Sequence, residues 1–260
     1  MLRQIEDEGA VQPIIDAFDD PSAVVRAHAA YAMTAFSSPE ALEPLIQLLG
    51  DSSENVVLRV TDALDTYDVS APNRLLEVYA DESVPYRDAI EDALTSYYYA
   101  HYLEIVAAAQ GVCNGTPIEN ATAYNRYEEG PHPVIILNSS NKYSYWNSNI
   151  PVEWRPYSPE QVQAVVCTDT NEKVVVQVCR YYYTGTGAAA PSKTRYRWKS
   201  TGALYNASTA RSLGSFALYG SLPDYCPYTS TSGASTSITG GYVQYEDLEK
   251  WLRTMGFRWE

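Results

Sequence analysis

The chain has 260 residues, 45% of them hydrophobic, and carries a formal net charge of −14 at pH 7. This length suits two modest domains, and the acidity argues against nucleic acid or an anionic membrane as a partner. The charge is uneven, because residues 1–100 hold 19 acids and five bases, whereas the 13 acids and 13 bases that follow cancel. We expect an acidic first part whose surface is simply solvated or, alternatively, docks onto a basic partner.

The first part of the chain, from about Val11 to Leu94, repeats one unit three times. Each copy has an apolar segment, an acidic turn and a second apolar segment, and equivalent positions such as Pro13 and Pro44 lie 31 residues apart. A fixed period near 30 residues, built from two short amphipathic helices, predicts an α-solenoid.

An acid stands between the two helices of each copy, at Asp20, Asp51 and Asp81. A carboxylate in this position can cap the second helix and interact favourably with the positive end of its dipole. The spacing therefore predicts one such contact per repeat.

Three segments carry a family resemblance: Ala-Val-Val-Arg-Ala-His-Ala-Ala at 23–30, Leu-Ile-Gln-Leu-Leu-Gly-Asp at 45–51 and Tyr-Arg-Asp-Ala-Ile-Glu-Asp-Ala-Leu at 86–94. They resemble the HEAT-repeat family, particularly its short bacterial form, over roughly residues 1–95. The second copy departs from that pattern at Val57, where the family has an arginine. The resemblance implies a stacking scaffold and no chemistry, because such arrays serve many unrelated functions.

The segment after the repeats, Thr95–Gln110, is expected to continue as helix until Gly111 stops it. We expect an α-solenoid with an extended last helix over 1–110, a linker over 111–131 and a disulfide-bearing β domain over 132–260. The N-terminal residues read as the end of a preceding helix, and they resemble neither a signal peptide nor a transmembrane segment. The array is therefore expected to open part-way through a repeat, with an end that needs a cap.

The second domain is expected to consist mainly of strands. Two strands, Val162–Cys167 and Lys173–Tyr183, are predicted to form a hairpin with a polar turn at Asp169–Glu172. Further strands and a last helix are expected at Pro133–Leu137, Thr194–Lys199, Ala203–Ala207, Ser215–Tyr219 and Tyr245–Met255. The fold class is thus α+β multidomain, with an antiparallel sheet or sandwich and a terminal helix after the solenoid.

Four cysteines, all in this second part, are disulfide candidates: Cys113, Cys167, Cys179 and Cys226. Their spacing contains no CxxC and argues against zinc, whereas an even number in a β-rich region indicates an oxidising compartment. Three pairings are open, although the expected hairpin mildly disfavours joining Cys167 to Cys179. Four N-x-S/T sequons, at Asn114, Asn120, Asn138 and Asn206, are glycosylation candidates on a glycoprotein.

Several segments between 130 and 228 carry a second resemblance: Pro-Val-Glu-Trp-Arg-Pro at 151–156, Arg-Tyr-Arg at 195–197 and Gly-Ser-Leu-Pro-Asp-Tyr-Cys-Pro at 220–227. They resemble a β domain of uncharacterised bacterial extracytoplasmic proteins. That resemblance implies an exported domain and carries no assigned activity.

No catalytic, cofactor or metal site is predicted. The three histidines, His28, His101 and His132, lack ligand spacing, and the chain has no nucleophile-elbow motif. We therefore expect no catalytic residues, no cofactor-binding residues, no metal ligands and no enzymatic activity.

Aromatic residues are the most unusual feature, with 23 Tyr and 5 Trp against 4 Phe. Tyr and Trp suit surfaces that are buried on binding but wet otherwise, although core packing explains most of them. The interface or sugar-stacking candidates are Tyr97, Tyr98, Tyr99, Tyr143, Tyr145, Trp146, Tyr181, Tyr182 and Tyr183.

We expect a non-catalytic structural or protein-interaction subunit, extracellular or at the cell surface, with protein partners. Copies of the chain itself are one possible partner, and head-to-tail contacts would then form a filament or another polymer. The alternative is a monomeric binding module for a protein or carbohydrate ligand. Neither nucleic acid nor membrane insertion is expected.

Overall fold

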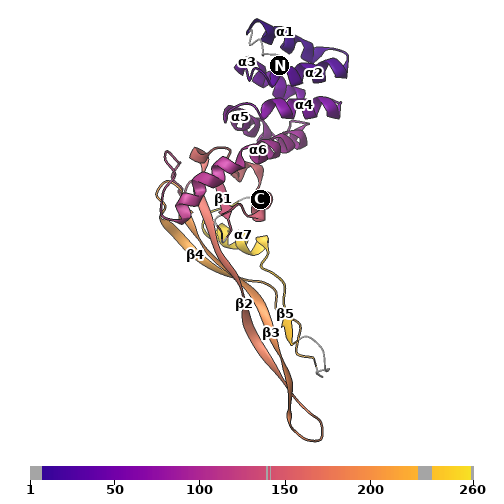
Figure 1. Ribbon diagram of the computed structural model, residues 1–260. Coiled ribbons are helices and arrows are strands. Elements are labelled where there is room, and N and C mark those ends of the chain that lie inside the picture. Colours follow the sequence, from indigo (N-terminus) through magenta and orange to yellow (C-terminus); the bar gives the residue numbers. More distant parts are fainter. Residues whose placement is uncertain (1–7, 139, 141, 228–235, 259–260) are drawn as a thin grey trace, which may run out of the picture. The chain divides into compact units, whose positions relative to one another are not determined.

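The computed structural model describes residues 8–138, 140, 142–227 and 236–258 (Figure 1). The chain forms two compact units, which are Met1–Ile105 with Pro151–Pro159, and Val106–Ile150 with Glu160–Glu260. The expected domain limits at 110 and 131 stay a prediction. The placement of Pro151–Pro159 with the helices is a feature that the sequence did not indicate.

The first unit is a helical repeat region. Its elements are the helices α1 (Val11–Asp16), α2 (Ala23–Met33), α3 (Pro39–Leu48), α4 (Glu54–Leu64), α5 (Ser70–Tyr79) and the start of α6 (Arg87–Cys113), with a short 3-10 turn at Ala17–Asp19. The second helices α2 and α4 pack against each other. Apolar residues at helical spacing form the core of this unit. Those at most 1% exposed include Leu45, Leu64, Leu75 and Leu94.

The acid of each copy has a repeated local role. The side chains of Asp20, Asp51 and Asp81 accept the backbone N–H two residues further on, at 2.8, 2.8 and 2.9 Å. Each carboxylate therefore closes an Asx turn just before its second helix, instead of bonding the first N–H groups inside that helix.

Tyrosines also tie neighbouring copies together. Tyr67 donates its hydroxyl to the carbonyl of Ser38 at 2.7 Å, and Tyr97, one repeat later, donates to the carbonyl of Tyr67 at 3.2 Å. Burial raises the pKa of both phenols to about 12. Each phenol thus satisfies a carbonyl of the preceding copy.

The long helix α6 continues two residues past Gly111 and ends at Cys113. The expected stop at Gly111 is therefore wrong. Gly115 has φ +87° and supplies the left-handed residue, while Thr116 N–H donates to the carbonyl of Gly111 at 2.9 Å and Gly115 N–H to that of Val112 at 3.1 Å. These two bonds form a Schellman motif, for which glycine is the preferred residue.

The second unit is built on one mixed sheet. Its strands are β1 (Val134–Leu137), β2 (Ala164–Tyr182), β3 (Ala189–Asn206), β4 (Ser212–Tyr219) and β5 (Ser237–Thr239). The order is β1-β2-β3-β4, with β5 on β3, and the β1–β2 and β3–β5 pairs are parallel. The described residues form no second sheet, so the wholly antiparallel sheet or sandwich gives way to a mixed single sheet, which helix α7 (Tyr245–Thr254) follows in the chain.

The predicted hairpin turn at Asp169–Glu172 is wrong, because β2 runs through it as one strand. Thr168 pairs with Gly202 and Asn171 with Ser200, so β2 carries one extra residue at this point. The polar run is thus a β-bulge instead of a turn. The true hairpin joins β2 to β3 at residues 183–188.

The segments Thr194–Lys199 and Ala203–Ala207 were predicted as separate strands but belong to the one strand β3. Gly202, which stands between the two predicted segments, pairs with Thr168 on one side and with Phe216 on the other. A Cβ there would clash with the carbonyl of Cys167 and the ring of Phe216. This glycine permits close strand approach.

The two strands β2 and β3 extend beyond the rest of the sheet as a ribbon (Figure 1), here called the β-ribbon and defined as residues 171–200. β1 pairs only with Ala164–Cys167, so within the described residues the rest of β2 has a strand partner on the β3 side alone. The β-ribbon therefore presents both of its faces to solvent along most of β2.

Candidate functional site

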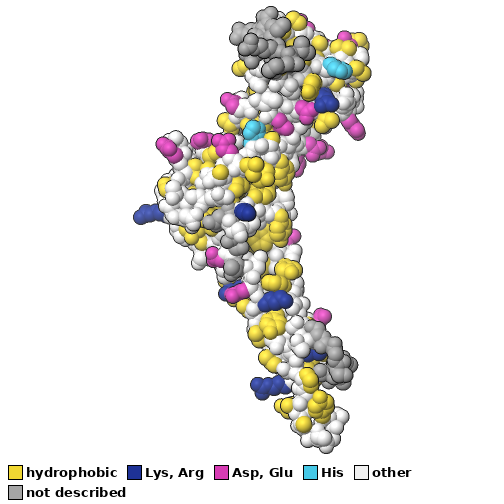
Figure 2. Space-filling view, viewed as in Figure 1, with side chains coloured by type: hydrophobic (Ala, Val, Ile, Leu, Met, Phe, Trp, Pro, Cys, Tyr) yellow, Lys and Arg dark blue, Asp and Glu magenta, His cyan; other side chains and the backbone are white. Residues whose placement is uncertain are grey.

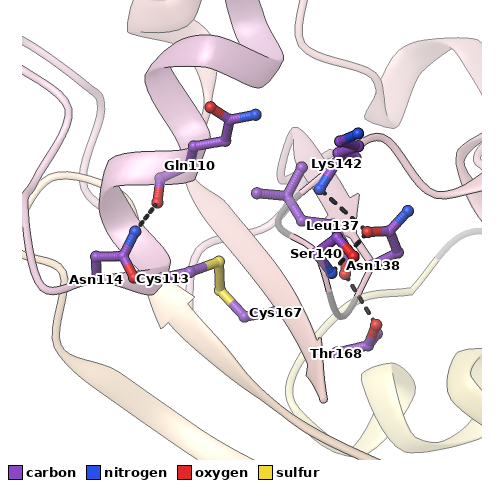
Figure 3. Close-up of a disulfide and its surroundings, with 9 residues drawn as sticks. All are labelled: Gln110, Cys113, Asn114, Leu137, Asn138, Ser140, Lys142, Cys167 and Thr168. Atoms are coloured by element: carbon purple, nitrogen blue, oxygen red, sulfur yellow. Dashed lines mark hydrogen bonds between the residues drawn. A yellow bond between two sulfur atoms is a disulfide. The ribbon is translucent and has the colours of Figure 1, made fainter. Parts of the chain in front are cut away.

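Two disulfides fasten the second unit. Cys113 at the end of α6 is joined to Cys167 on β2 (Figure 3), and Cys179 on the β-ribbon is joined to Cys226. The Cα–Cα distances are 5.8 and 5.7 Å, as expected for disulfides. The pairing of Cys167 with Cys179, which the sequence disfavoured, is absent from these described residues, and all four cysteines are used.

The four sequons lie in different environments. Asn114 is exposed beside Cys113 and donates to the carbonyl of Gln110 at 3.1 Å (Figure 3), and Asn120 is exposed with φ +60°. Asn138 is half-buried, and Asn206 is only 8% exposed and donates to the carbonyl of Tyr124 at 3.4 Å. Asn206 is thus buried and hydrogen-bonded in the fold, and glycosylation of the four asparagines stays a prediction.

The aromatic candidates also separate by exposure. Tyr97, Tyr98 and Trp146 are 3%, 1% and 6% exposed, so they are not part of an open interface. Tyr97 and Tyr98 instead contact Tyr157, with ring centroids 6.1 and 6.2 Å apart, inside the first unit. The sequence missed this role because residues 151–159 carry no repeat signal.

Of the remaining aromatic candidates, Tyr99, Tyr145, Tyr182 and Tyr183 are exposed, and Tyr143 and Tyr181 are half-buried. Tyr182 and Tyr183 lie at the tip of the β-ribbon. These four exposed rings can contact a partner.

The β-ribbon is basic and apolar. Residues 171–200 contain six Lys and Arg and one acid, a balance of +5. A hollow of about 460 Å³ on this surface combines the cations Arg197 and Lys199 with exposed Val175 and Leu222. Arg195 anchors the ribbon from inside, donating to the carbonyls of Asp224 and Pro223 at 2.8 and 2.7 Å.

The helical array has the opposite charge. Acidic side chains gather on its helices, whereas Lys and Arg are spaced along the β-ribbon (Figure 2). Between α2 and α4 lies a groove of about 330 Å³ lined by His28, Tyr31 and Arg59, with the guanidinium of Arg59 5.2 Å from the Tyr31 ring centroid. Leu58, on the same helix as Arg59, is 54% exposed.

A third feature is a cleft of about 620 Å³ at the carboxyl end of β1, here called the β1-end cleft. Tyr145, Trp146 and Tyr242 supply aromatic rings, and Asp169 and Asn171 supply polar groups from the bulge of β2. Such a mixture of aromatic surface and a few polar groups is typical of small-molecule sites. Tyr143, Tyr145 and Trp146 were visible as an aromatic cluster in the sequence, but Tyr242 was not linked to them.

The comparison with protein families matches residues 11–95 to a model described as HEAT repeats. This is about a third of the chain and coincides with the helical array. No curated protein matches the chain. HEAT repeats indicate a protein-interaction or scaffold role, and they are typically non-catalytic.

The structure also bears on compartment and metal binding. The two disulfides hint at an oxidising environment. Among the described residues, no helix is long and apolar enough to cross a membrane. The same residues bring together no group of three or more His, Cys, Asp or Glu that could hold a metal ion.

Proposed function

We propose that the chain is a non-catalytic interaction protein, active outside the cytoplasm, that assembles when the acidic helical array of one copy binds the basic β-ribbon of another. The observation that carries the proposal is charge complementarity, −14 over residues 1–100 against +5 over residues 171–200. Opposite potentials on two surfaces speed association and select the partner.

Apolar contacts support the same pairing. The array exposes Val24, Tyr31 and Leu58 on its second helices, at 62%, 55% and 54%. The β-ribbon exposes Val175 and Tyr182, at 59% and 63%. Burying these side chains would add to the electrostatic attraction, since exposed apolar patches rimmed by charge are typical of interaction sites.

Such a contact joins two different surfaces and is therefore heterologous. Repeated heterologous contacts form rings when the rotation closes and filaments when it does not. The extracellular location is supported by the two disulfides and by the resemblance of residues 130–228 to exported β domains.

The test is sedimentation of the purified chain over a range of concentrations and salt, with electron microscopy of the same samples. We expect larger species at higher concentration and their loss as salt screens the charges. The double variant Lys173→Glu/Arg180→Glu, at two exposed positions of the β-ribbon, should stay monomeric. The control Lys250→Glu makes one charge reversal at an exposed position of α7 and should assemble normally.

A rescue experiment identifies the partner surface. The array variant Glu54→Lys/Asp88→Lys keeps its basic β-ribbon, and the β-ribbon variant keeps its acidic array. Each alone should therefore stay monomeric, whereas their mixture should form two-copy complexes and no longer species. A monodisperse monomer at high concentration and low salt would contradict self-assembly.

The second candidate function is a monomeric module that binds a protein or carbohydrate ligand. The β1-end cleft favours its carbohydrate form, because exposed Tyr145 and Tyr242 line the same cleft as Asp169 and Asn171. These are groups that contact the apolar and hydroxyl parts of a sugar.

A further inference from the structure

We infer that the β1-end cleft binds a neutral sugar, an inference that rests on the carbohydrate form of the second candidate function. The cleft lies where β1 ends at Leu137 and β2 bulges between Thr168 and Asn171. Bulges are common beside binding sites because they redirect side chains. A volume of about 620 Å³ falls within the range of small-molecule pockets.

Two exposed aromatic rings of the cleft are held in place before any ligand arrives. Tyr242 is 61% exposed, and its ring is stacked on Trp198 with centroids 4.6 Å apart and planes 20° apart. Tyr145 is 72% exposed and meets Trp146 edge-on, with centroids 5.9 Å apart. Rings fixed in this way offer flat apolar surface to the C–H face of a pyranose with little loss of conformational entropy.

The indole N–H of Trp146 provides a spectroscopic probe in the wall of the cleft. The side chain lines the cleft and is only 6% exposed, and its Nε1 has no hydrogen-bond partner among the described residues. That nitrogen is closed to solvent, so it is not counted among the groups that contact the ligand. Its N–H signal instead reports on changes in the wall of the cleft.

The polar groups of the cleft select among ligand classes. Asp169 places a carboxylate on the rim, which disfavours phosphate, sulfate and acidic sugars. A quaternary ammonium would suit the aromatic rings and the carboxylate, but it has no hydrogen-bond donor for the amide carbonyl of Asn171. A neutral polyhydroxy ligand donates both to the carboxylate and to the Asn171 carbonyl, and it accepts from the Asn171 amide N–H.

The test follows the indole N–H signals of the 15N-labelled full-length chain by NMR. The probes are the methyl glycosides of glucose, galactose, mannose and N-acetylglucosamine, each raised to tens of millimolar, with choline as the competing ligand class. The variant Trp146→Phe assigns the signal. We expect that at least one glycoside shifts it saturably and that choline does not.

Two variants locate the site. Tyr242→Ala should weaken binding of that glycoside by about tenfold, the loss expected for one aromatic contact. Tyr127→Ala, which removes an 86% exposed ring outside the cleft, should leave the affinity unchanged.

The inference is overturned when no glycoside shifts the Trp146 signal, when choline alone shifts it, or when Tyr242→Ala binds as well as the original chain. Titrations are made on the unmodified chain at high salt, which is expected to dissociate the assembly, and its assembly is measured separately at low salt. The β-ribbon variant is not used here, because Lys173 lies 5.2 Å from the centroid of the Trp198 ring that supports Tyr242. Failure of sugar binding in a chain that still assembles on its unmodified β-ribbon removes the sugar site and leaves the proposed assembly intact.

Discussion

The helical array and the second unit are stabilised by different kinds of contact. In the array, ties between copies join residues about one repeat apart, as Tyr97 and Tyr67 do at a separation of 30. In the second unit, Ile118 N–H bonds to the carbonyl of Ala207, and disulfides close separations of 54 and 47 residues. The array contains no cysteine.

The difference shows how each region distributes its stabilising contacts. Stacked repeats are stabilised by contacts between nearest neighbours, so the loss of one contact destabilises mainly its own copy and the adjacent copies. Along most of β2 the β-ribbon has only β3 as a strand partner, and two-stranded ribbons are marginal in water without further support. Its support comes from the Cys179–Cys226 disulfide, the buried Arg195 and the short strand β5.

Removing a disulfide should cause the largest loss of stability and thus tests this comparison most strongly. Cys113→Ser/Cys167→Ser should destabilise the second unit by about 4 kcal/mol, because the closed loop of 54 residues no longer restricts the unfolded chain. Hydrogen–deuterium exchange with mass spectrometry should show faster exchange in β1 and β2. Peptides from α3 to α5 are the internal control, and equal loss of protection in them would contradict the division between the regions.

A core truncation in the array should have the next largest effect. Leu64→Ala, at a side chain 1% exposed, should lower the free energy of unfolding by about 3 kcal/mol through lost burial and the resulting cavity. Leu58→Ala changes the same residue type on the same helix at a position 54% exposed, and should change it by less than about 0.5 kcal/mol. Urea unfolding followed by circular dichroism measures both, and equal losses would contradict the assigned packing.

These regions were also unequally predictable from the sequence. The repeats were predicted because their apolar positions recur locally every 30 or 31 residues, and the helices and the family match confirm them. The strand limits failed at Asp169–Glu172 and at Gly202, since a bulge and a close strand approach use the same polar and small residues that turns use.

The candidate sites depend on contacts that no local pattern reveals. The four cysteines predicted disulfides, but their pairing depends on the fold. Cys167 and Cys179 lie on the same strand β2, and they pair with Cys113 and Cys226 respectively. The aromatic cluster at 143–146 was visible, whereas Tyr242 joins it only through the fold, about a hundred residues later.

An ion pair in the array gives a smaller, pH-dependent effect. Arg26 donates to both oxygens of Asp51 at 2.6 and 3.0 Å, and this hydrogen bonding lowers the pKa of the carboxyl below its ordinary value of 3.8. The folded state therefore binds fewer protons than the unfolded chain as pH falls below about 4, so this stabilisation is present above that pH and is lost below it.

Arg26→Gln should thus lower the melting temperature at neutral pH by less than Leu64→Ala does, and should reduce the acid dependence of the melting temperature. Thermal melts from neutral to strongly acidic pH measure this. Arg59→Gln is the control, since its pair with Asp62 is 39% exposed on both sides and contributes little. An unchanged acid dependence in Arg26→Gln would contradict the role of the pair.

The smallest expected effect is a gain in stability at neutral pH, whereas the variants above lose stability. Asp65 lies at the end of α4, where burial raises the pKa of its carboxyl although Ser96 donates to Oδ2 at 2.8 Å. Its Oδ1 is buried without a hydrogen-bond partner among the described residues. Because the folded-state pKa lies above 3.8, the folded state binds more protons than the unfolded chain just above that value, and stability falls as pH rises through this window.

Asp65→Asn removes the buried charge, while the amide oxygen can still accept from Ser96. We expect the free energy of unfolding to rise by about 0.5 kcal/mol at pH 7, and the gain to vanish in acid, where the carboxyl of the original chain is protonated. Asp68→Asn is the matched control, because Ser70 lowers the pKa of that exposed carboxyl and its loss cannot stabilise the fold by this route. Urea unfolding at neutral and acidic pH distinguishes them, and a gain that persists in acid would show that Asp65 acts through packing and not through its charge.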